Sequence, residues 1–537
     1  MNALILVLIS IAAFSIAYLT YGAWLTKQWG IDDTKPTPAH TRGDGVDYVP
    51  ASSAVLLGHH FASIAGAGPI VGPIAAAIFG WIPVLLWIIV GSIFFGGVQD
   101  YSSLFASVRH EGKSIGEVIQ TNMGTNGKRL FSVFAWLTLL LVVAAFVNIV
   151  ANTFVAVPAA GTASVLFILL AIAFGNLVYR RGFSLKLGSA IGIVLLLACI
   201  ALGNLFPLEL SRNVWILFLL IYISVASVTP VWILLQPRDY LNAYLLYAML
   251  AGAVLGLLIT RPALQLEGYI GFNVGGQYLF PILFITVACG AISGFHSLVG
   301  SGTSSKQLTK ESDAKLVGYG GMLIEGVLAT VAIITAAYVA GPRLTELLAD
   351  GGPVNVFSDG IGVFMTSFGI PFEIGKSFVA LAVSAFALTS LDTATRLGRF
   401  ILQEYFEPED PTEKKPFFTN MYAATGVTVV LGGLLAITSW QLIWPIFGSA
   451  NQLLAALSLM AVAVWLKKIK KGYKMFIFPI VFMFAATLLA LIFLGRNNFV
   501  AGNWILVIFP IILFILAIIL LVQGFGILFK TEAPDQE

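Results

Sequence analysis

The amino-acid sequence predicts an all-α polytopic membrane protein in which a single membrane domain takes up the whole chain, residues 1–537. Hydrophobic residues make up 58% of the chain and charged residues only 10%, whereas a soluble domain carries roughly 25% charged residues. So few charges cannot cover a water-facing surface, and we therefore expect lipid to cover much of it. Apolar runs also alternate with short polar segments, none long enough to bury a catalytic core of its own.

The individual spans follow from the roughly 20 apolar residues that a helix needs to cross a bilayer. About fifteen runs approach this length, and segment 354–370 is expected to be re-entrant or interfacial. The first run is expected to be a retained span rather than a secretory signal, because no Lys or Arg precedes it. The spans are expected near 3–24, 50–79, 82–106, 130–153, 161–179, 187–205, 213–235, 239–260, 278–299, 317–341, 373–392, 418–438, 442–465, 474–494 and 502–529.

The distribution of positive charge supports an odd number of spans. If the segments between spans are assigned alternately to two sides, only five of the 29 Lys and Arg residues fall on one side. These five are Arg212, Arg261, Arg343, Lys376 and Arg496. Positive residues collect in cytoplasmic loops, so the sequence predicts a cell-membrane protein with its N-terminus outside and its C-terminus in the cytoplasm.

The span at 50–79 contains a cluster that an ordinary lipid-facing helix does not need. His59 and His60 precede Gly66, Gly68 and Pro69 in the middle of an apolar run. Proline removes a helix hydrogen bond, and irregular backbone at membrane depth is tolerated only where protein or a water-filled cavity surrounds it. We therefore expect a broken helix whose freed backbone groups bind an ion or a carboxylate. The alternative is close packing of neighbouring helices through small residues.

The span at 278–299 and the residues after it repeat this pattern, with His296 followed by Gly300 and Gly302. By the count of spans, this segment runs in the opposite direction to the first. Two broken helices of opposite direction are typical of inverted-repeat transporters. The alternative is a chance similarity between two glycine-rich membrane segments.

A third cluster lies near the cytoplasmic end of the span at 373–392. Thr389, Ser390 and Asp392 offer hard oxygen ligands that suit Na⁺, and the carboxylate could instead carry a proton. The alternative is an ion pair between Asp392 and Arg396, which are separated by one helical turn.

Polar groups inside other spans also indicate function, because burying them in a membrane is costly. Glu325 lies nearest to mid-span and is the strongest candidate for a proton carrier or for the partner of a histidine. Arg238 and Asp239 are expected in a cytoplasmic turn, where they can pair. Each of the remaining groups could instead be an interhelical hydrogen bond, and they are Gln99, Asp100, Asn148, Asn152, Asn451 and Gln452.

Six blocks of sequence, in order along most of the chain, resemble the carbon starvation protein A (CstA) family. The resemblance implies a LeuT-like inverted repeat of the amino acid–polyamine–organocation (APC) superfamily, with substrate-lining breaks at Gly66–Gly68 and Gly300–Gly302. It also places Thr389 and Ser390 where LeuT-like proteins hold a coupling Na⁺. The blocks are HHFASIAGAGP (59–69) with VQD (98–100), SVTPVW (227–232) with QPRDY (236–240), GAISGFH (290–296) with SGT (301–303), GYGGMLIE (318–325), LDTATR (391–396) and SANQLLA (449–455).

The same resemblance suggests a division of the membrane domain. Residues 50–205 are expected to form the first repeat and 278–465 the second. Helices in 206–277 would lie between the repeats, and helices in 466–537 would follow them. The two helices expected in 213–260 have no assigned place in this scheme.

The resemblance implies a secondary active transporter that imports peptides, pyruvate or both in the carbon starvation response. The substrate carboxylate is expected at His59, His60, His296 and the glycines of the two breaks. The coupling ion, H⁺ by preference, is expected at Asp392 or Glu325. The alternatives are a Na⁺-coupled transporter of another small carboxylate or amino acid, and a membrane-embedded metal-dependent enzyme. We expect no cofactor, no bound metal and no nucleic acid, and the sequence makes no prediction of oligomeric state.

Overall fold

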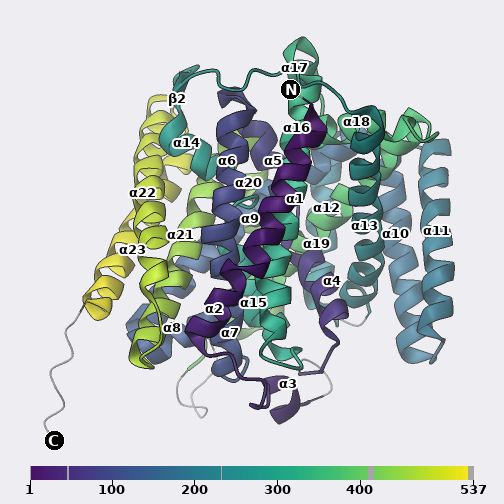
Figure 1. Cartoon of the computed structure of the whole chain (residues 1–537). Helices are drawn as coiled ribbons and strands as arrows, with labels where there is room; N and C mark the ends of the chain where they lie inside the picture. Colours follow the sequence, from purple (N-terminus) through teal and green to yellow (C-terminus); the bar gives the residue numbers. More distant parts are fainter. Residues whose placement is uncertain (1, 45–47, 231–232, 409–415, 530–537) are drawn as a thin grey trace, which may run out of the picture.

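The computed structural model describes residues 2–44, 48–230, 233–408 and 416–529. Most of the helices run side by side along one direction and form a single bundle (Figure 1). The first helix begins at the end of the bundle where α17 lies, and the last helix ends at the opposite end. An odd number of crossings is consistent with this arrangement. Residues 530–537, which include the predicted cytoplasmic C-terminus, lie outside the described part.

Helices make up nearly all of the regular structure, with one two-stranded sheet formed by β1 (Asn273–Val274) and β2 (Gln277–Tyr278). The helices are α1 (Ala3–Leu19), α2 (Tyr21–Trp29), α3 (Pro38–Thr41), α4 (Ser53–Ile64), α5 (Gly68–Ala75), α6 (Trp81–Gly91), α7 (Gly97–Arg109), α8 (Ile115–Met123), α9 (Thr125–Ala156), α10 (Pro158–Gly175), α11 (Leu185–Leu205), α12 (Arg212–Val228), α13 (Leu235–Thr260), α14 (Leu279–Thr286), α15 (Gly294–Gly302), α16 (Gly321–Val339), α17 (Gly341–Ala349), α18 (Pro353–Thr366), α19 (Phe372–Phe406), α20 (Met421–Ala436), α21 (Trp440–Lys468), α22 (Ile477–Val500) and α23 (Trp504–Leu528).

Eleven helices among the described residues are long and apolar enough to cross a membrane, or twelve if the bent pair α4 and α5 counts as one span. The two shorter apolar helices α12 and α20 occupy two more of the fifteen predicted segments, and α14 with α15 occupies the last. The predicted span 213–235 ends earlier than expected, at Val228, and its residues 231–232 lie outside the described part. Segment 354–370 forms the short, buried helix α18.

The bundle has a buried interior and a lipid-facing edge. The apolar stretch of α21 is entirely buried, whereas only 33% of that of α11 is buried. Leu187, Val194 and Leu197 on α11 are more than half exposed, as lipid-facing side chains are. The hairpin of α10 and α11 lies at one edge of the bundle in Figure 1, and α13 packs inside it against α4, α18 and α19.

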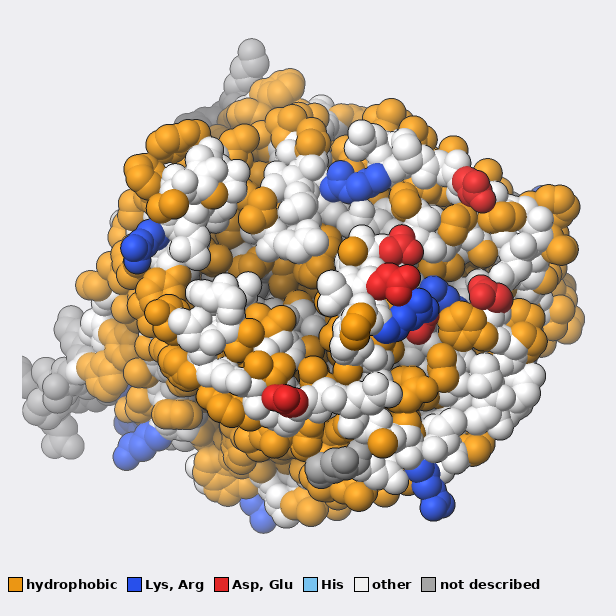
Figure 2. Space-filling view, turned by 90° about the horizontal axis from the view of Figure 1, so that it is seen from above, with side chains coloured by type: hydrophobic (Ala, Val, Ile, Leu, Met, Phe, Trp, Pro, Cys, Tyr) orange, Lys and Arg blue, Asp and Glu red, His pale blue; other side chains and the backbone are white. Residues whose placement is uncertain are grey.

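The end of the bundle where α17 lies carries little positive charge. Seen from above, it shows mainly hydrophobic and uncharged groups, with scattered Lys and Arg and several Asp and Glu side chains (Figure 2). This view agrees with the sequence pattern that assigns few basic residues to one side.

The predicted break in the first broken helix is confirmed. The α4 helix ends at Ile64, residues 65–67 are not α-helical, and α5 begins at Gly68, followed by Pro69. The two halves are bent by 47°. Pro69 suits the first turn of α5, because N–H groups in the first turn have no hydrogen-bond partner within the helix and proline lacks this N–H.

A second broken helix also exists, but its break lies elsewhere than predicted. Helix α14 ends at Thr286, α15 begins at Gly294, and residues 287–293 between them are not helical. Gly300 and Gly302 therefore do not mark a break, because they form the last turn of α15. Figure 1 shows α4 and α5 running toward the end with α17, whereas α14 and α15 run away from it.

Glycines allow the two broken helices to cross closely. A Cβ atom added at Gly68 would lie 2.5 Å from the Cβ atom of Cys289, in the second break. A Cβ atom at Gly72 would lie 2.6 Å from the backbone oxygen of Thr286. Any larger side chain at either glycine would push the two broken helices apart, which explains the small residues around the first break.

Candidate functional site

The two broken helices bring His60 into contact with the segment after α15. His60 is buried, and its Nδ1 lies 2.7 Å from the hydroxyl oxygen of Ser304. Gly300 lies beside the same imidazole: a Cβ atom added at Gly300 would be 3.9 Å from Cε1 of His60. The neighbouring His59 is half-buried, and its backbone oxygen accepts a hydrogen bond from Ser63. Of the two adjacent histidines, therefore, only His60 points into the bundle.

A chain of buried ionisable groups connects α7, α15 and α16. Nδ1 of His296 lies 2.8 Å from Oδ2 of Asp100, and its Nε2 lies 3.4 Å from Oε2 of Glu325. All three side chains are at most 1% exposed. With its amide oriented so that the nitrogen meets acceptors, Gln99 donates to Asp100 over 2.6 Å and to the backbone oxygen of Ser293 over 3.0 Å. The sequence had marked Asp100 only as a polar group inside a span.

The hydrogen bonding of this triad is incomplete. Three buried atoms have no hydrogen-bond partner among the described residues: both carboxylate oxygens of Glu325 and Nε2 of His296. Buried polar atoms are nearly always hydrogen-bonded, so these atoms are suited to accept or release a proton. His296 also interacts with the backbone of Ile64 at the end of α4, and electrostatically with His60. The triad therefore adjoins the first break.

Asp392 belongs to a second buried cluster, which is centred on Arg238. The Arg238 guanidinium pairs with Asp392 through Nη1, and its Nη2 lies 3.1 Å from Oδ1 of Asp239. Tyr222 accepts a hydrogen bond from Arg238 over 2.5 Å and donates one to Asp392 over 2.9 Å. The predicted pairing of Arg238 with Asp239 is confirmed. Its predicted place in a cytoplasmic turn is wrong, because Arg238 is fully buried in the first turn of α13.

The hydroxyl groups of Thr389 and Ser390 connect this cluster to the first break. Thr389 donates to Asp239 over 2.9 Å and accepts a hydrogen bond from Asn242 over 3.0 Å. Ser390 donates to the backbone oxygen of Ser63 over 3.2 Å, one residue before the end of α4. Gly66 packs against Ser390 as well, and Gly302 faces Leu397 on α19. The predicted site residues are thus divided between two clusters, one on α7, α15 and α16 and one on α13 and α19. Helix α4 contacts helices of both clusters.

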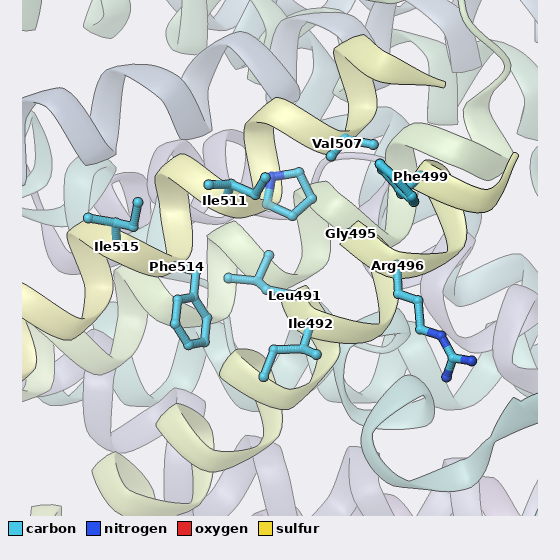
Figure 3. Close-up of a pocket in the computed structure, with 10 residues that line it drawn as sticks. Leu491, Ile492, Gly495, Arg496, Phe499, Val507, Ile511, Phe514 and Ile515 are labelled. Carbon is cyan, nitrogen blue, oxygen red and sulfur yellow. The ribbon is translucent and has the colours of Figure 1, made fainter. Parts of the chain in front are cut away.

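Two cavities lie away from these clusters. An apolar pocket of about 350 Å³ lies between α22 and α23, at the edge of the bundle in Figure 1. Its lining includes Leu491, Arg496 and Phe514 (Figure 3). A more polar cavity of about 300 Å³ is formed by α9, α12, the end of α17 and the start of α21. In the polar cavity, Arg212 donates to Asn152 over 3.1 Å, and Asn152 donates to Asn148.

A sequence profile described as carbon starvation protein CstA matches residues 2–349 and 341–490. This chain belongs to the CstA family.

Three proteins named as transporters are similar to this chain over most of its length. The peptide transporter CstA of Escherichia coli (strain K12) is 35% identical over 88% of this chain and 78% of its own length. The corresponding protein of Bacillus subtilis (strain 168) is 32% identical over 98% of this chain and 96% of its own. The pyruvate/proton symporter BtsT of E. coli (strain K12) is 32% identical over 88% and 78%. The protein is therefore a membrane transporter and not an enzyme.

The fold is also similar to that of a solved transporter. A manganese transporter of Eremococcus coleocola superposes with a TM-score of 0.51 at 12% identity, covering 90% of this chain and 99% of the other. This likeness supports the polytopic transporter fold expected from the sequence. In the described residues, no group of three or more His, Cys, Asp or Glu side chains could hold a metal ion.

Proposed function

We propose that this CstA family member imports a small carboxylate, either pyruvate or a short peptide, together with protons. The proposal depends chiefly on one observation, the buried triad of Asp100, His296 and Glu325 beside the first break. Ionisable groups at membrane depth are costly and usually mark ion or proton pathways. Relatives named for peptide transport and for pyruvate/proton symport support both the substrate class and the ion.

In this mechanism, the triad is the proton site. His296 lies between two carboxylates, so one proton shared by the three groups would leave a net charge of −1 and a second would neutralise them. Neutralisation lowers the cost of keeping the triad away from water during the change of access. Because His296 follows the second break and contacts the backbone of Ile64 at the first, the protonation state can affect both broken helices.

The substrate carboxylate would bind where the two breaks meet. Helix α5 begins at Gly68 and α15 begins at Gly294, so the N-termini of both half-helices lie at the breaks. The positive ends of the two helix dipoles favour an anion there. At the start of α15, the N–H of Phe295 already donates to Oδ1 of Asn451 over 2.9 Å. His60 adds a polar side chain between α4 and Ser304. For a peptide, the carboxylate of Glu325 could also neutralise the ammonium group.

We further propose that the fold contains a LeuT-like inverted repeat, with α4 and α5 related to α14 and α15. The opposite directions of the two broken helices support this relation. The repeat boundaries 50–205 and 278–465, and the N-terminus outside the cell, remain predictions. The polar cavity lined by Arg212 lies at the end with α17 and would then be an outer entrance. Expression in carbon starvation is the physiological setting that the family suggests.

Uptake into proteoliposomes tests the proposed function. The purified protein is reconstituted, and labelled pyruvate and a labelled dipeptide are offered under an inward proton gradient without sodium. We expect uptake of one substrate above protein-free liposomes, and a protonophore should abolish its accumulation. Accumulation that survives the protonophore, or that needs sodium, would refute proton coupling. Facilitated uptake with no accumulation under any gradient and no counterflow of substrate would instead identify a channel.

A further inference from the structure

The cluster around Arg238 occupies the position where the sequence predicted a coupling sodium ion. Thr389, Ser390 and Asp392 were expected to provide hard oxygen ligands, and the structure brings the first and last of these together with Asp239. The group at the centre of these oxygens is the guanidinium of Arg238. It contacts two carboxylates and the hydroxyl of Tyr222, and its side chain is 0% exposed.

We infer that Arg238 is a built-in cation that fills the place of a coupling sodium ion between α13 and α19. The inference rests on the proposed function and deepens it, because it explains why protons and not sodium would drive transport. A covalently attached cation cannot leave with the substrate, so the cluster cannot couple transport to a sodium gradient. The charge instead stays in place and holds α13 against α19.

The surroundings of Arg238 contain the ligands that an alkali cation would need. Within the cluster, Asp239 and Asp392 contribute charged oxygens, and Thr389 and Tyr222 contribute hydroxyl oxygens. Such hard oxygen ligands are those that hard cations take in proteins. Asn242 orients Thr389 by donating a hydrogen bond to its oxygen over 3.0 Å. Removing the guanidinium would leave two carboxylates buried without their cation, which is strongly unfavourable.

The inference therefore makes a specific prediction about the variant Arg238→Ala. Loss of the guanidinium should create a site for a small free cation, such as Na⁺ or added guanidinium. In Arg238→Lys, an ammonium group retains the charge and should keep sodium out. The matched control is Arg399→Ala, because Arg399 is also a buried arginine but donates to the backbone oxygen of Ser227 over 2.7 Å.

Sodium binding is measured directly on the purified full-length protein in lipid nanodiscs, with radiolabelled sodium and with thermal unfolding in sodium chloride against choline chloride. The wild type, Arg238→Lys and Arg399→Ala should bind no sodium saturably and should unfold at the same temperature in both salts. Arg238→Ala should gain saturable sodium binding and a sodium-dependent rise in unfolding temperature. The double variant Arg238→Ala with Asp392→Asn should lose both. A folded Arg238→Ala that binds neither sodium nor guanidinium would overturn the inference.

Transport provides a second measurement that does not need a folded Arg238→Ala. Uptake by the wild type should be unchanged when choline replaces sodium, whereas sodium-stimulated uptake would overturn the inference. If Arg238→Ala folds, its uptake should fall at least about tenfold and recover with added guanidinium. The proposed function is tested by a different outcome, because it fails if a protonophore leaves substrate accumulation intact. Sodium binding to the variants is measured without any transport, so the two failures can be told apart.

Discussion

Replacement of Glu325 by Gln is the sharpest test of the proton site. The substitution keeps the size and shape of the side chain but removes its ability to carry a charge. Glu325 is fully buried, and its Oε2 lies 3.4 Å from Nε2 of His296. Because His296 lies so close to Glu325, loss of the Glu325 charge should mainly weaken the binding of a proton by His296. We expect Glu325→Gln to fold and to bind pyruvate, which has no ammonium group for Glu325 to neutralise, but to lose coupling to the proton gradient.

The size of the effect follows from the geometry. Two unit charges 3.4 Å apart attract by about 5 kcal/mol at an effective dielectric constant of about 20. A gradient of one pH unit supplies about 1.4 kcal/mol for each proton carried inward, which corresponds to about tenfold accumulation of substrate. The interaction that Glu325 provides is several times larger than this driving force. Its removal should therefore reduce accumulation from about tenfold to about equal concentrations on the two sides.

The assay compares two modes of transport in proteoliposomes. Accumulation under a gradient of one pH unit should be lost in Glu325→Gln, whereas exchange of labelled for unlabelled substrate without a gradient should persist. Exposed Glu404 provides the control, because Glu404→Gln removes a carboxylate outside the triad and should leave accumulation unchanged. If Glu325→Gln accumulates substrate as the wild type does, the triad is not the coupling site.

Three further changes probe the fold and the site. Gly68→Ala should lower the unfolding free energy by about 1–3 kcal/mol, because the added Cβ atom would lie 2.5 Å from Cys289; chemical denaturation measures this loss, and Cys289→Gly should restore part of it. His60→Ala should reduce uptake several-fold without changing the unfolding temperature as much as Gly68→Ala does, and normal uptake with normal membrane insertion would exclude His60 from the substrate site. Glu311→Ala should cost about 1–3 kcal/mol through the lost ion pair with Arg109, whose Nε lies 2.6 Å from Oε1 of Glu311; a thermal shift would detect this, and an unchanged midpoint would contradict it.

The sequence predicted those features of the fold that depend on local composition. Apolar length located the spans, because each helix must match the bilayer by itself. The first break was also predictable, since Pro69 and its neighbouring glycines act locally. The predicted position of the second break was wrong. Gly300 and Gly302 resemble a helix break in the sequence, but in the structure they pack beside His60 and Leu397. A glycine needed for packing and a glycine needed for bending look the same in one sequence.

The clusters of charged residues were harder to predict, because their members come from distant parts of the chain. Asp100 contacts His296 from a position 196 residues away, and no local pattern connects them. Arg238 was placed in a cytoplasmic turn because it follows Pro237 between two apolar runs. Its partner Asp392 lies 154 residues further along the chain, so only the folded structure shows that the charge is compensated.

The contact between Gly68 and Cys289 also constrains how the molecule can move. The side chain of Cys289 packs directly against the backbone of Gly68, so a bend at either break would press one broken helix against the other. A tilt of α5 must displace the non-helical segment before α15, and a tilt of α15 must displace α5. If the protein works by the proposed alternating access, this contact would couple movement of the first broken helix to movement of the second. In that case, the absence of a side chain at Gly68 would keep the two broken helices in direct contact while they move.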